Sequence, residues 1–301
     1  MRAVSLAEIT RGRLLTDCDL ELSCNFRFDA NLVLRADCFF HFDGDEEALL
    51  KAIARGAFAV IFCGAIQTAL DTEIAYIQCD DPVRALAGVL RFLTLENRSK
   101  VFACDPISYA IAKKIIAPKH FCAADSLQTA IEEFNNSAAL LCVKGSDIDE
   151  YAASSPMGQV QAVCAQYSIF ESVIFLNSKI EYFELSSIFA DRLQSVVAFA
   201  DSHDLSISAN RRVEIEGFDI FPIFLDRYVI LDSLGIENEV IRFFSQNMAW
   251  LKLYIPPKVS VCILAEELKN GVYNFAYVSN VNKDDLLANA ARILPKSASL
   301  F

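Results

Sequence analysis

Two short segments gather residue types that could do chemistry. In Asp201–Asp204 the imidazole of His203 stands between carboxylates, an arrangement that could support acid-base catalysis. The segment Gly145–Glu150 carries three carboxylates that could hold a cation, but their spacing is not that of a calcium-binding loop. Because both segments are polar, we favour a solvated loop for the first and a polar loop or short helix for the second.

The motifs of common enzyme classes are absent. The sequence has no G-x-S-x-G elbow, no G-x-G-x-x-G fingerprint and no S-x-x-K. His41, His120 and His203 are too far apart for H-x-x-x-H or H-E-x-x-H spacing, so only folding could assemble a metal site. We therefore predict no catalytic residue, no metal site and no cofactor. The cysteines form no C-x-x-C pair and favour buried thiols in a reducing compartment: Cys18, Cys24, Cys38, Cys63, Cys79, Cys104, Cys122, Cys142, Cys164 and Cys262.

Composition and charge narrow the function classes. Hydrophobic residues make up 54% of the chain and the mean hydropathy is +0.32, so we expect apolar surface to meet a protein partner or a second copy. Apolar runs such as Ala57–Ile66 are shorter than the ~20 residues of a membrane span. The N-terminus lacks the apolar core of a signal peptide, and we expect a cytoplasmic protein. A net charge of −12 opposes binding to nucleic acid.

Short strand-like runs alternate with amphipathic helical stretches, which predicts an α/β fold. Gly56 is the expected C-cap of one helix, and Asp80 and Asp81 before Pro82 start another. Predicted helices are Leu6–Leu14, Glu46–Arg55, 82–93, Ile107–Ile116, Ser126–Phe134, Asp226–Leu234, Glu237–Ala249 and Lys283–Ile293.

Strands are predicted between these helices, with hairpins Ser172–Leu176/Lys179–Phe183 around Asn177 and Ser178, and Val213–Ile215/Ile220–Phe224. The polar segment Glu96–Lys100 indicates a domain boundary, and we predict domains 1–99, 100–210 and 211–301. The remaining predicted strands are Asp37–Phe42, Phe58–Cys63, Ile74–Gln78, Lys100–Cys104, Ala138–Val143, Val196–Phe199, Lys258–Leu264 and Val272–Val278.

The first segment contains four short motifs, whose order along the chain is informative: S-L-A-E-I-T at 5–10, D-C-F-F-H-F at 37–42, G-A-F-A-V at 56–60 and D-D-P-V-R-A-L at 80–86. In this order they resemble the N-terminal domain of Mur ligases, nearest the type that adds D-Ala-D-Ala to a UDP-muramoyl tripeptide. The resemblance covers residues 1–116. It implies a Mur-ligase-like N-terminal domain followed by a reduced α/β region like the family's central domain.

The resemblance also implies where nucleotides would bind. The family holds its uridine nucleotide through D-S-R or D-T-R and a later D-G-H; the first falls here on Asp29, Ala30 and Asn31, and the second is shortened to Asp43–Glu46. The hydroxyl and guanidinium that would bind phosphate are missing from these positions. Added carboxylates would repel a diphosphate.

The family's central domain opens with a strand and the phosphate-cradling G-T-N-G-K-T/S. Here the strand at Val101–Cys104 is followed by Asp105, Pro106, Ile107, Ser108, Tyr109 and Ala110, with neither glycine nor lysine. A proline removes a backbone donor and an aspartate adds negative charge, so we predict that the usual triphosphate site is lost. Lys113 and Lys114, a helical turn further on, are expected to be surface charges.

The sequence therefore favours a non-catalytic Mur-ligase-like protein of the cytoplasmic peptidoglycan pathway that binds a protein partner, either a Mur enzyme or a second copy. One alternative is an ATP-dependent UDP-muramoyl-peptide amide ligase with diverged sites, and another is a small-molecule sensor. An aromatic partner-binding patch, for which core packing is the favoured explanation, would comprise Phe243, Phe244, Trp250 and Tyr254 with Pro256 and Pro257.

Overall fold

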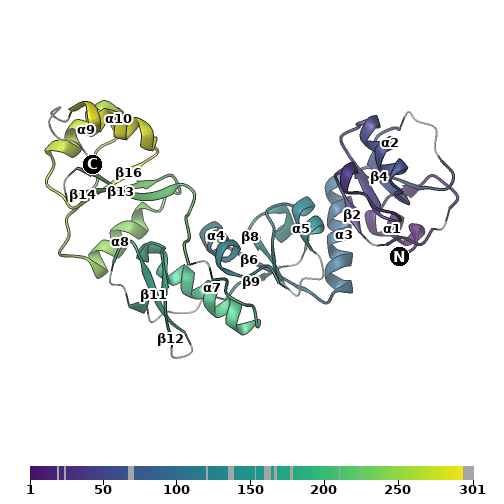
Figure 1. Ribbon diagram of the computed structural model, residues 1–301, viewed down its shortest axis with the longest axis horizontal. Coiled ribbons are helices and arrows are strands. Elements are labelled where there is room, and N and C mark those ends of the chain that lie inside the picture. Colours follow the sequence, from purple (N-terminus) through teal and green to yellow (C-terminus); the bar gives the residue numbers. More distant parts are fainter. Residues whose placement is uncertain are drawn as a thin grey trace. The chain divides into compact units, whose positions relative to one another are not determined.

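The chain forms two compact units in the computed structural model (Figure 1). Unit 1 comprises Met1–Gly158 and Phe199–Ile207, and unit 2 comprises Gln159–Ala198 and Ser208–Phe301. The three predicted domains, 1–99, 100–210 and 211–301, stay a prediction. The structure describes residues 1–18, 20–23, 25–66, 71–119, 121–134, 139–152, 154–158, 164–165, 168–176, 179–209, 211–224 and 226–293.

The first sheet of unit 1 has the strand order β1-β5-β4-β3-β2. The strands β2 to β5 are parallel, and the edge strand β1 runs antiparallel to β5. The elements of this part are α1 (Ala3–Thr10), β1 (Arg13–Leu14), β2 (Phe26–Arg27), η1 (Ala30–Leu32), β3 (Cys38–His41), α2 (Glu46–Ala54), β4 (Ala59–Cys63), β5 (Ala75–Cys79) and α3 (Pro82–Glu96).

Helices cover both faces of this sheet, because successive side chains of a strand point to opposite faces. In β4, Ile61 packs in the cluster that includes α1 and α3, whereas Val60 packs with Leu49 of α2. The predicted N-cap Asp81 is confirmed: its Oδ1 accepts hydrogen bonds from the backbone N–H of Val83 and Arg84 at the start of α3.

The second sheet of unit 1 is entirely parallel, with the order β7-β8-β6-β9. The helix α3 packs against α1 and also against α5, so it joins the two sheets into one hydrophobic core that extends from Ile61 to Leu140 (Figure 1). The elements are β6 (Lys100–Cys104), α4 (Pro106–Ile115), β7 (Phe121–Ala123), α5 (Leu127–Glu133), β8 (Ala139–Val143), α6 (Asp147–Tyr151) and β9 (Ser155–Pro156).

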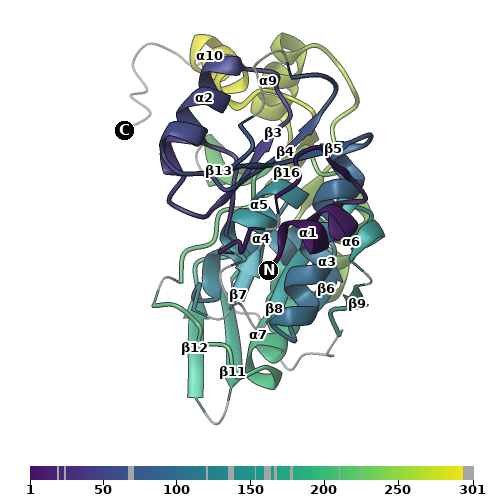
Figure 2. The ribbon, with the colours of Figure 1, turned by 90° about the vertical axis from the view of Figure 1, so that its right-hand side faces the viewer.

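Unit 2 contains two smaller sheets, the antiparallel β10-β11-β12 and the mixed β13-β14-β16-β15. Figure 2 shows the strands β11 and β12 side by side, and α9 and α10 pack on the second sheet. The elements are β10 (Cys164–Ala165), β11 (Ser172–Leu176), β12 (Lys179–Phe183), η2 (Ser187–Phe189), α7 (Ala190–Ser202, of which the residues from Phe199 on belong to unit 1), β13 (Phe218–Phe224), β14 (Arg227–Asp232), α8 (Glu237–Asn247), β15 (Leu253–Tyr254), α9 (Val261–Asn270), β16 (Phe275–Ser279) and α10 (Lys283–Ile293).

The predicted α/β class is confirmed, as is the hairpin of β11 and β12, whose predicted turn residues Asn177 and Ser178 lie outside the described residues. Within the described part of the chain, no helix is both long and apolar enough to cross a membrane.

Two predicted strands are helices instead. Val196–Phe199 lies inside α7, where Leu193, Val197 and Ala200 are all buried at helical spacing. The predicted strand Lys258–Leu264 is replaced by α9 from Val261 on. Both runs are rich in β-branched residues, which favour strands only weakly, and packing of one helical face overrides that preference.

Two further predictions in the first and third segments are corrected. The helix predicted over Leu6–Leu14 ends at Thr10, where Arg11 adopts a left-handed φ of 54°, and β1 follows. The helix predicted over Asp226–Leu234 is β14, which pairs with β13 in a hairpin that replaces the predicted partner Val213–Ile215. The apolar run of β14 is buried between β13 and β16, so tertiary pairing decides its conformation.

Candidate functional site

The first position that sequence analysis singled out is a surface turn. Asp29 is the N-cap of η1, and its Oδ1 accepts hydrogen bonds from the backbone N–H of Asn31 at 2.8 Å and from its side-chain Nδ2 at 2.7 Å. These hydrogen bonds lower the pKa of the Asp29 carboxyl. Ala30 between them is buried. The carboxylate thus stabilises its own turn.

The shortened second position also caps the local backbone. The carboxylate of Asp43 accepts from the N–H of Asp45 at 3.2 Å, and Asp45 in turn caps α2 by accepting from the N–H groups of Glu47 and Ala48. The buried His41 ring lies 3.4 Å from the Asp43 carboxylate. Acidic side chains here stabilise the start of a helix, whose positive end favours them.

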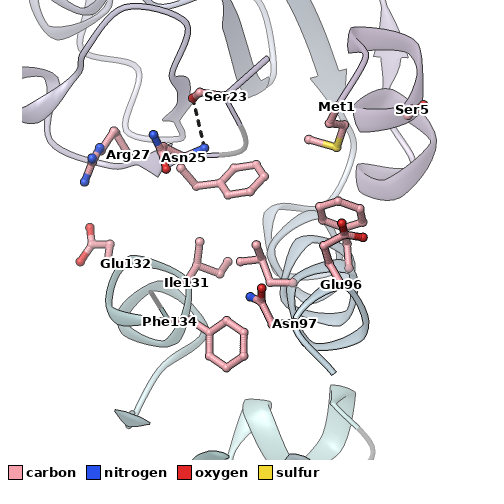
Figure 3. Close-up of a pocket in the computed structure, with 13 residues that line it drawn as sticks. Met1, Ser5, Ser23, Asn25, Arg27, Glu96, Asn97, Ile131, Glu132 and Phe134 are labelled. Carbon is pink, nitrogen blue, oxygen red and sulfur yellow. Dashed lines mark hydrogen bonds between the residues drawn. The ribbon is translucent and has the colours of Figure 1, made fainter. Parts of the chain in front are cut away.

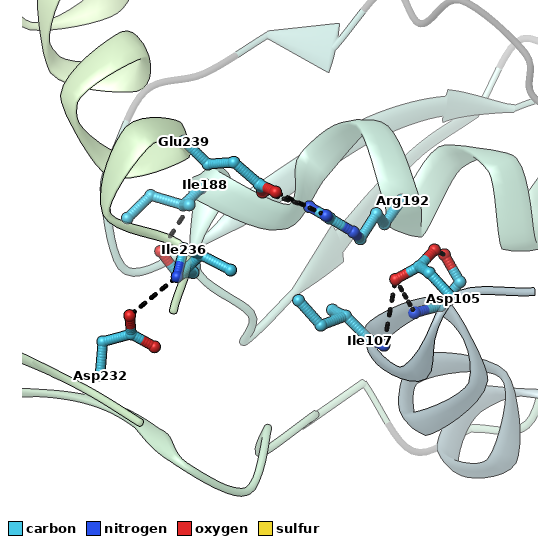
Figure 4. A network of polar contacts seen from close by, with 9 residues as sticks. Asp105, Ile107, Ile188, Arg192, Asp232, Ile236 and Glu239 are labelled. Atoms are coloured by element: carbon cyan, nitrogen blue, oxygen red, sulfur yellow. Dashed lines mark hydrogen bonds and ion pairs between the residues drawn. The ribbon is translucent and has the colours of Figure 1, made fainter. Parts of the chain in front are cut away.

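The third position is the junction of β6 and α4, where a single residue separates strand from helix. Asp105 caps α4: its Oδ1 accepts from the N–H of Ile107 and of Ser108, both at 3.1 Å, and its Oδ2 accepts from the Ser108 hydroxyl at 2.5 Å (Figure 4). Pro106 is the first helical residue and Ala110 lies in the next turn. A carboxylate of the chain itself therefore occupies the helix end at which anions otherwise bind.

Lys113 and Lys114 are exposed, as predicted. Lys113 Nζ lies 5.8 Å from the centre of the Tyr109 ring and 3.9 Å from the Asp125 carboxylate. Both contacts are compatible with the predicted role of Lys113 as a surface charge.

A cavity of about 670 Å³ lies in unit 1 between the β2 segment, α3 and α5 (Figure 3). This volume is within the range of small-molecule pockets. The lining combines an apolar floor with a few polar groups, and comprises Met1, Ser5, Ser23, Asn25, Phe26, Arg27, Phe92, Leu93, Glu96, Asn97, Ile131, Glu132 and Phe134.

One buried carboxylate holds the polar side chains that line one side of this cavity. Asp37, just before β3, is 1% exposed and accepts hydrogen bonds from Ser23 Oγ at 3.1 Å and from Asn25 Nδ2 at 3.2 Å. Its other oxygen accepts from Arg27 Nε at 3.1 Å and from the N–H of Leu34 at 2.9 Å. Four donors compensate the burial of the charge and fix the orientation of the Arg27 guanidinium.

Arg27 belongs to no motif that could be recognised in the sequence. It lies two residues before Asp29, and its pairing with Asp37 spans the parallel strands β2 and β3, with Arg27 in register with Phe39. The spacing of Arg27 and Asp37 in sequence gives no signal of this pairing. The cavity consequently presents the Arg27 guanidinium and the carboxylates of Glu96 and Glu132 beside the buried rings of Phe26 and Phe134. It therefore offers charges of both signs and a flat apolar surface to a ligand.

Comparison with solved structures finds Mur ligases. MurF from Acinetobacter baumannii is similar with a TM-score of 0.49 and 11% identity, over 96% of this chain and 87% of that one. The MurF ligase of Thermotoga maritima, solved with ADP, has a TM-score of 0.49 and 8% identity over 89% and 96% of the two chains. A UDP-N-acetylmuramoyl-L-alanyl-D-glutamate–2,6-diaminopimelate ligase has a TM-score of 0.41 and 11% identity over 92% and 85%. Neither a protein-family profile nor a curated protein matches the chain.

The histidine predicted between carboxylates is a packing residue. His203 follows α7, and its ring packs against those of Phe102 and Phe199 at centroid distances of 4.8 and 4.6 Å. Its Nδ1 lies 2.9 Å from both the Phe199 carbonyl and the Ser202 hydroxyl. These contacts pack the half-buried ring against two phenylalanines. The predicted solvated loop is corrected in part, because Asp201 and Ser202 form the exposed end of α7.

The acidic segment Gly145–Glu150 forms the start of the short helix α6, in agreement with one of the two alternatives. Asp149 accepts hydrogen bonds from the Ser154 hydroxyl and from the N–H of Gly145, and these lower its pKa. Among the residues that the structure describes, no three His, Cys, Asp or Glu side chains are grouped so as to hold a metal ion.

The cysteines that the structure describes with their side chains are free thiols. Burial is confirmed for Cys38, Cys79, Cys104, Cys122 and Cys142, whereas Cys262 is exposed. The predicted positions Cys24 and His120 and the side chain of Cys164 lie outside the described residues.

The aromatic run in unit 2 divides between core and surface. Phe243 and Phe244 are buried, and the ring of Tyr254 stacks on that of Tyr273. Trp250 is 79% exposed. The favoured core packing is thus confirmed for the phenylalanines, whereas Trp250 and Pro257 are exposed and Tyr254 and Pro256 are half-buried.

Proposed function

We propose that this chain is a Mur-ligase-like protein of the cytoplasmic peptidoglycan pathway that does not catalyse ligation and acts by binding a protein partner. The resemblance of residues 1–116 to the N-terminal domain of Mur ligases supports the family. The main support for a loss of catalysis is the position of the Asp105 carboxylate at the start of α4.

Ligation in this family begins with a triphosphate, and a cradling loop needs free backbone N–H groups and a nearby cation. At the end of β6 the first free N–H groups of α4 are already bonded to Asp105, and Pro106 has none to offer. A phosphate at this helix end would have to displace a carboxylate and tolerate its charge. These interactions oppose ATP binding in the family's manner.

Isothermal titration of the purified full chain with Mg-ATP and, separately, with a UDP-muramoyl peptide tests the loss of catalysis. We expect no heat of binding with Mg-ATP and none with the UDP-muramoyl peptide. Micromolar affinity for ATP would refute the proposal and favour instead the alternative of an ATP-dependent UDP-muramoyl-peptide amide ligase with diverged sites.

The proposed mode of action needs a second measurement. Sedimentation of the chain alone and with each cytoplasmic Mur ligase should give a complex of defined stoichiometry, either with one ligase or between two copies. A chain that sediments as a monomer in every mixture would exclude interaction with these partners as its function.

The cavity beside Arg27 favours a second candidate, a small-molecule sensor that keeps a pocket without the chemistry. In a thermal-shift measurement, a UDP-muramoyl peptide should then raise the melting temperature of the wild-type chain and of an Arg35→Gln control. It should not raise that of Arg27→Gln. Equal shifts in both variants, or none in the wild type, would reject this candidate.

A further inference from the structure

A second cavity, of about 520 Å³, lies in unit 1 beside α1 and α3, and arginines form its polar side. Arg11, Arg84 and Arg91 line it, whereas none of its lining residues is acidic. The whole chain carries 27 basic and 39 acidic residues. Three arginines in the lining of one small hollow are therefore against the charge balance of the molecule.

Two of the arginines are held by the geometry of α3. Arg84 and Arg91 are seven residues apart, so they lie on the same face of the helix, with Gly88 between them. A Cβ at Gly88 would come within 2.1 Å of the carbonyl oxygen of Ile9. The missing side chain lets α1 approach α3 closely, and the hollow lies beside this contact, with Gly88 in its lining.

The third arginine comes from the end of α1. Arg11 ends that helix in the left-handed conformation, with φ at 54°, and its N–H bonds to the carbonyls of Ala7 and Glu8. Glycine or asparagine is the usual residue in this position, because a larger side chain is strained there. The left-handed backbone conformation therefore does not explain why this residue is an arginine.

The two arginines of α3 keep part of their hydrogen-bonding capacity free. Arg84 uses Nε for Asp81, at 3.3 Å, and Arg91 uses Nε for the carbonyl oxygen of Tyr151, at 2.5 Å. Among the described residues, no hydrogen bond or ion pair engages the Nη groups of these two arginines or the side chain of Arg11. The anchored Nε atoms orient the guanidinium planes while the Nη ends remain available to an anion.

Apolar side chains form the rest of the lining. Ile9 and Phe92 are half-buried, and Leu95, one turn beyond Arg91, is 79% exposed. A ligand that covered Leu95 would remove this apolar side chain from water.

We propose that this cavity binds a small ligand that carries an oxyanion, either a carboxylate or a phosphate, on an apolar body. Guanidinium groups bind both oxyanions through paired N–H donors, and the apolar lining accepts the body of the ligand. The site includes none of the nucleotide positions and shares only Phe92 with the cavity beside Arg27, and the proposal does not rest on the proposed function.

Isothermal titration with three related probes tests the proposal: phenylbutyrate, phenyl phosphate and the neutral phenylbutanol. We expect at least one anion to bind the wild-type chain and the alcohol not to bind. Which anion binds more tightly identifies the source of the oxyanion, and either preference supports the site.

Variants locate the binding. The double variant Arg84→Gln/Arg91→Gln should bind the preferred anion at least about tenfold more weakly, because two charge-assisted hydrogen-bond donors are lost. Arg11→Gly should also bind more weakly while folding at least as well as the wild type, since glycine suits its backbone. Arg98→Gln, an exposed arginine outside the lining, is the matched control and should bind normally.

Three results would overturn the proposal. Neither anion binds the wild-type chain, the alcohol binds as tightly as the anions, or the anion binds equally well to the wild type and to the folded Arg11→Gly and double variants. Circular dichroism of each variant establishes that it is folded.

Discussion

Aspartates at the start of helices and turns in unit 1 accept hydrogen bonds from their own backbone. Asp29, Asp81 and Asp105 each cap a segment whose first N–H groups would otherwise lack partners. Two of these three residues stand where the Mur-ligase resemblance places nucleotide contacts. At the residue scale, the acidic residues of the nucleotide positions thus stabilise the fold.

The cap of α4 is testable by substitution. We expect Asp105→Ala to lower the free energy of unfolding by about 1–2 kcal/mol, because the N–H groups of Ile107 and Ser108 lose their acceptor. Asp105→Asn keeps a side-chain acceptor and should lose much less. Urea unfolding followed by circular dichroism measures both, and equal stability of Asp105→Ala and wild type would show that the cap contributes nothing.

The buried thiols predict a dependence of stability on pH. Burial raises the pKa of Cys104 and of Cys122 from the ordinary value of 9.0 to about 12. Above about pH 9 the unfolded chain therefore binds fewer protons than the native chain, and the free energy of unfolding falls as the pH rises towards 12. Near pH 7 both states keep the proton, so these thiols give no dependence there.

Urea unfolding at a series of pH values between about 7 and 11 measures this effect. The Cys122→Ala variant should show a shallower decline than the wild type, because one of the titrating thiols is gone. The tyrosines whose pKa burial raises, such as Tyr273, act in the same direction and remain in both proteins. An identical slope in the two proteins would contradict the assignment to Cys122.

At the scale of elements, α3 is the connection within unit 1. It packs against α1 on the first sheet and against α5 on the second, and both cavities border it. The close approach of α1 depends on Gly88, where the structure leaves no room for a side chain. The packing of one helix therefore sets the shape of both hollows.

Gly88→Ala should be destabilising despite the better helix propensity of alanine. The added Cβ would meet the Ile9 carbonyl at 2.1 Å, so α1 must shift, and overpacking of this kind costs about 1–3 kcal/mol. Gly158→Ala is the matched control because its Cβ would have open space, and it should change stability by less than about 0.5 kcal/mol. Urea unfolding measures the stability of both variants. If Gly88→Ala is as stable as the wild type, α1 can shift away from α3 at no cost in free energy.

At the scale of the whole molecule, the net charge of −12 dominates long-range interactions. The arginine-lined cavity is a local exception that suits a small anion, whereas a polymer of phosphates would meet the surrounding carboxylates as well. The net negative charge therefore disfavours binding of nucleic acid, whereas the arginine-lined cavity favours a small oxyanion.

We expect double-stranded DNA not to bind this protein, even at low salt, where electrostatic attraction would be strongest. An electrophoretic mobility shift measured over a range of salt concentrations tests this. A complex that forms at low salt and dissociates as salt is added would show that basic side chains overcome the net charge.

The sequence by itself determined the features that depend on local chemistry. The α/β class and the start of α3 at Asp81 and Pro82 follow from apolar periodicity and from which side chains can replace a backbone partner. Such signals lie within a few residues of one another, so they can be read directly from the chain.

Only the tertiary structure decided the elements and contacts that depend on distant partners. Val196–Phe199 is helical in α7 and Arg227–Asp232 is a strand because each run is buried against segments that its own sequence does not specify. The pairing of Arg27 with Asp37 and the meeting of Arg11 with Arg84 and Arg91 likewise join residues on separate elements. Strand register and helix packing bring these groups together. Both depend on the free energy gained when the apolar faces of whole strands and helices are buried, and the spacing of residues within a short segment does not predict this.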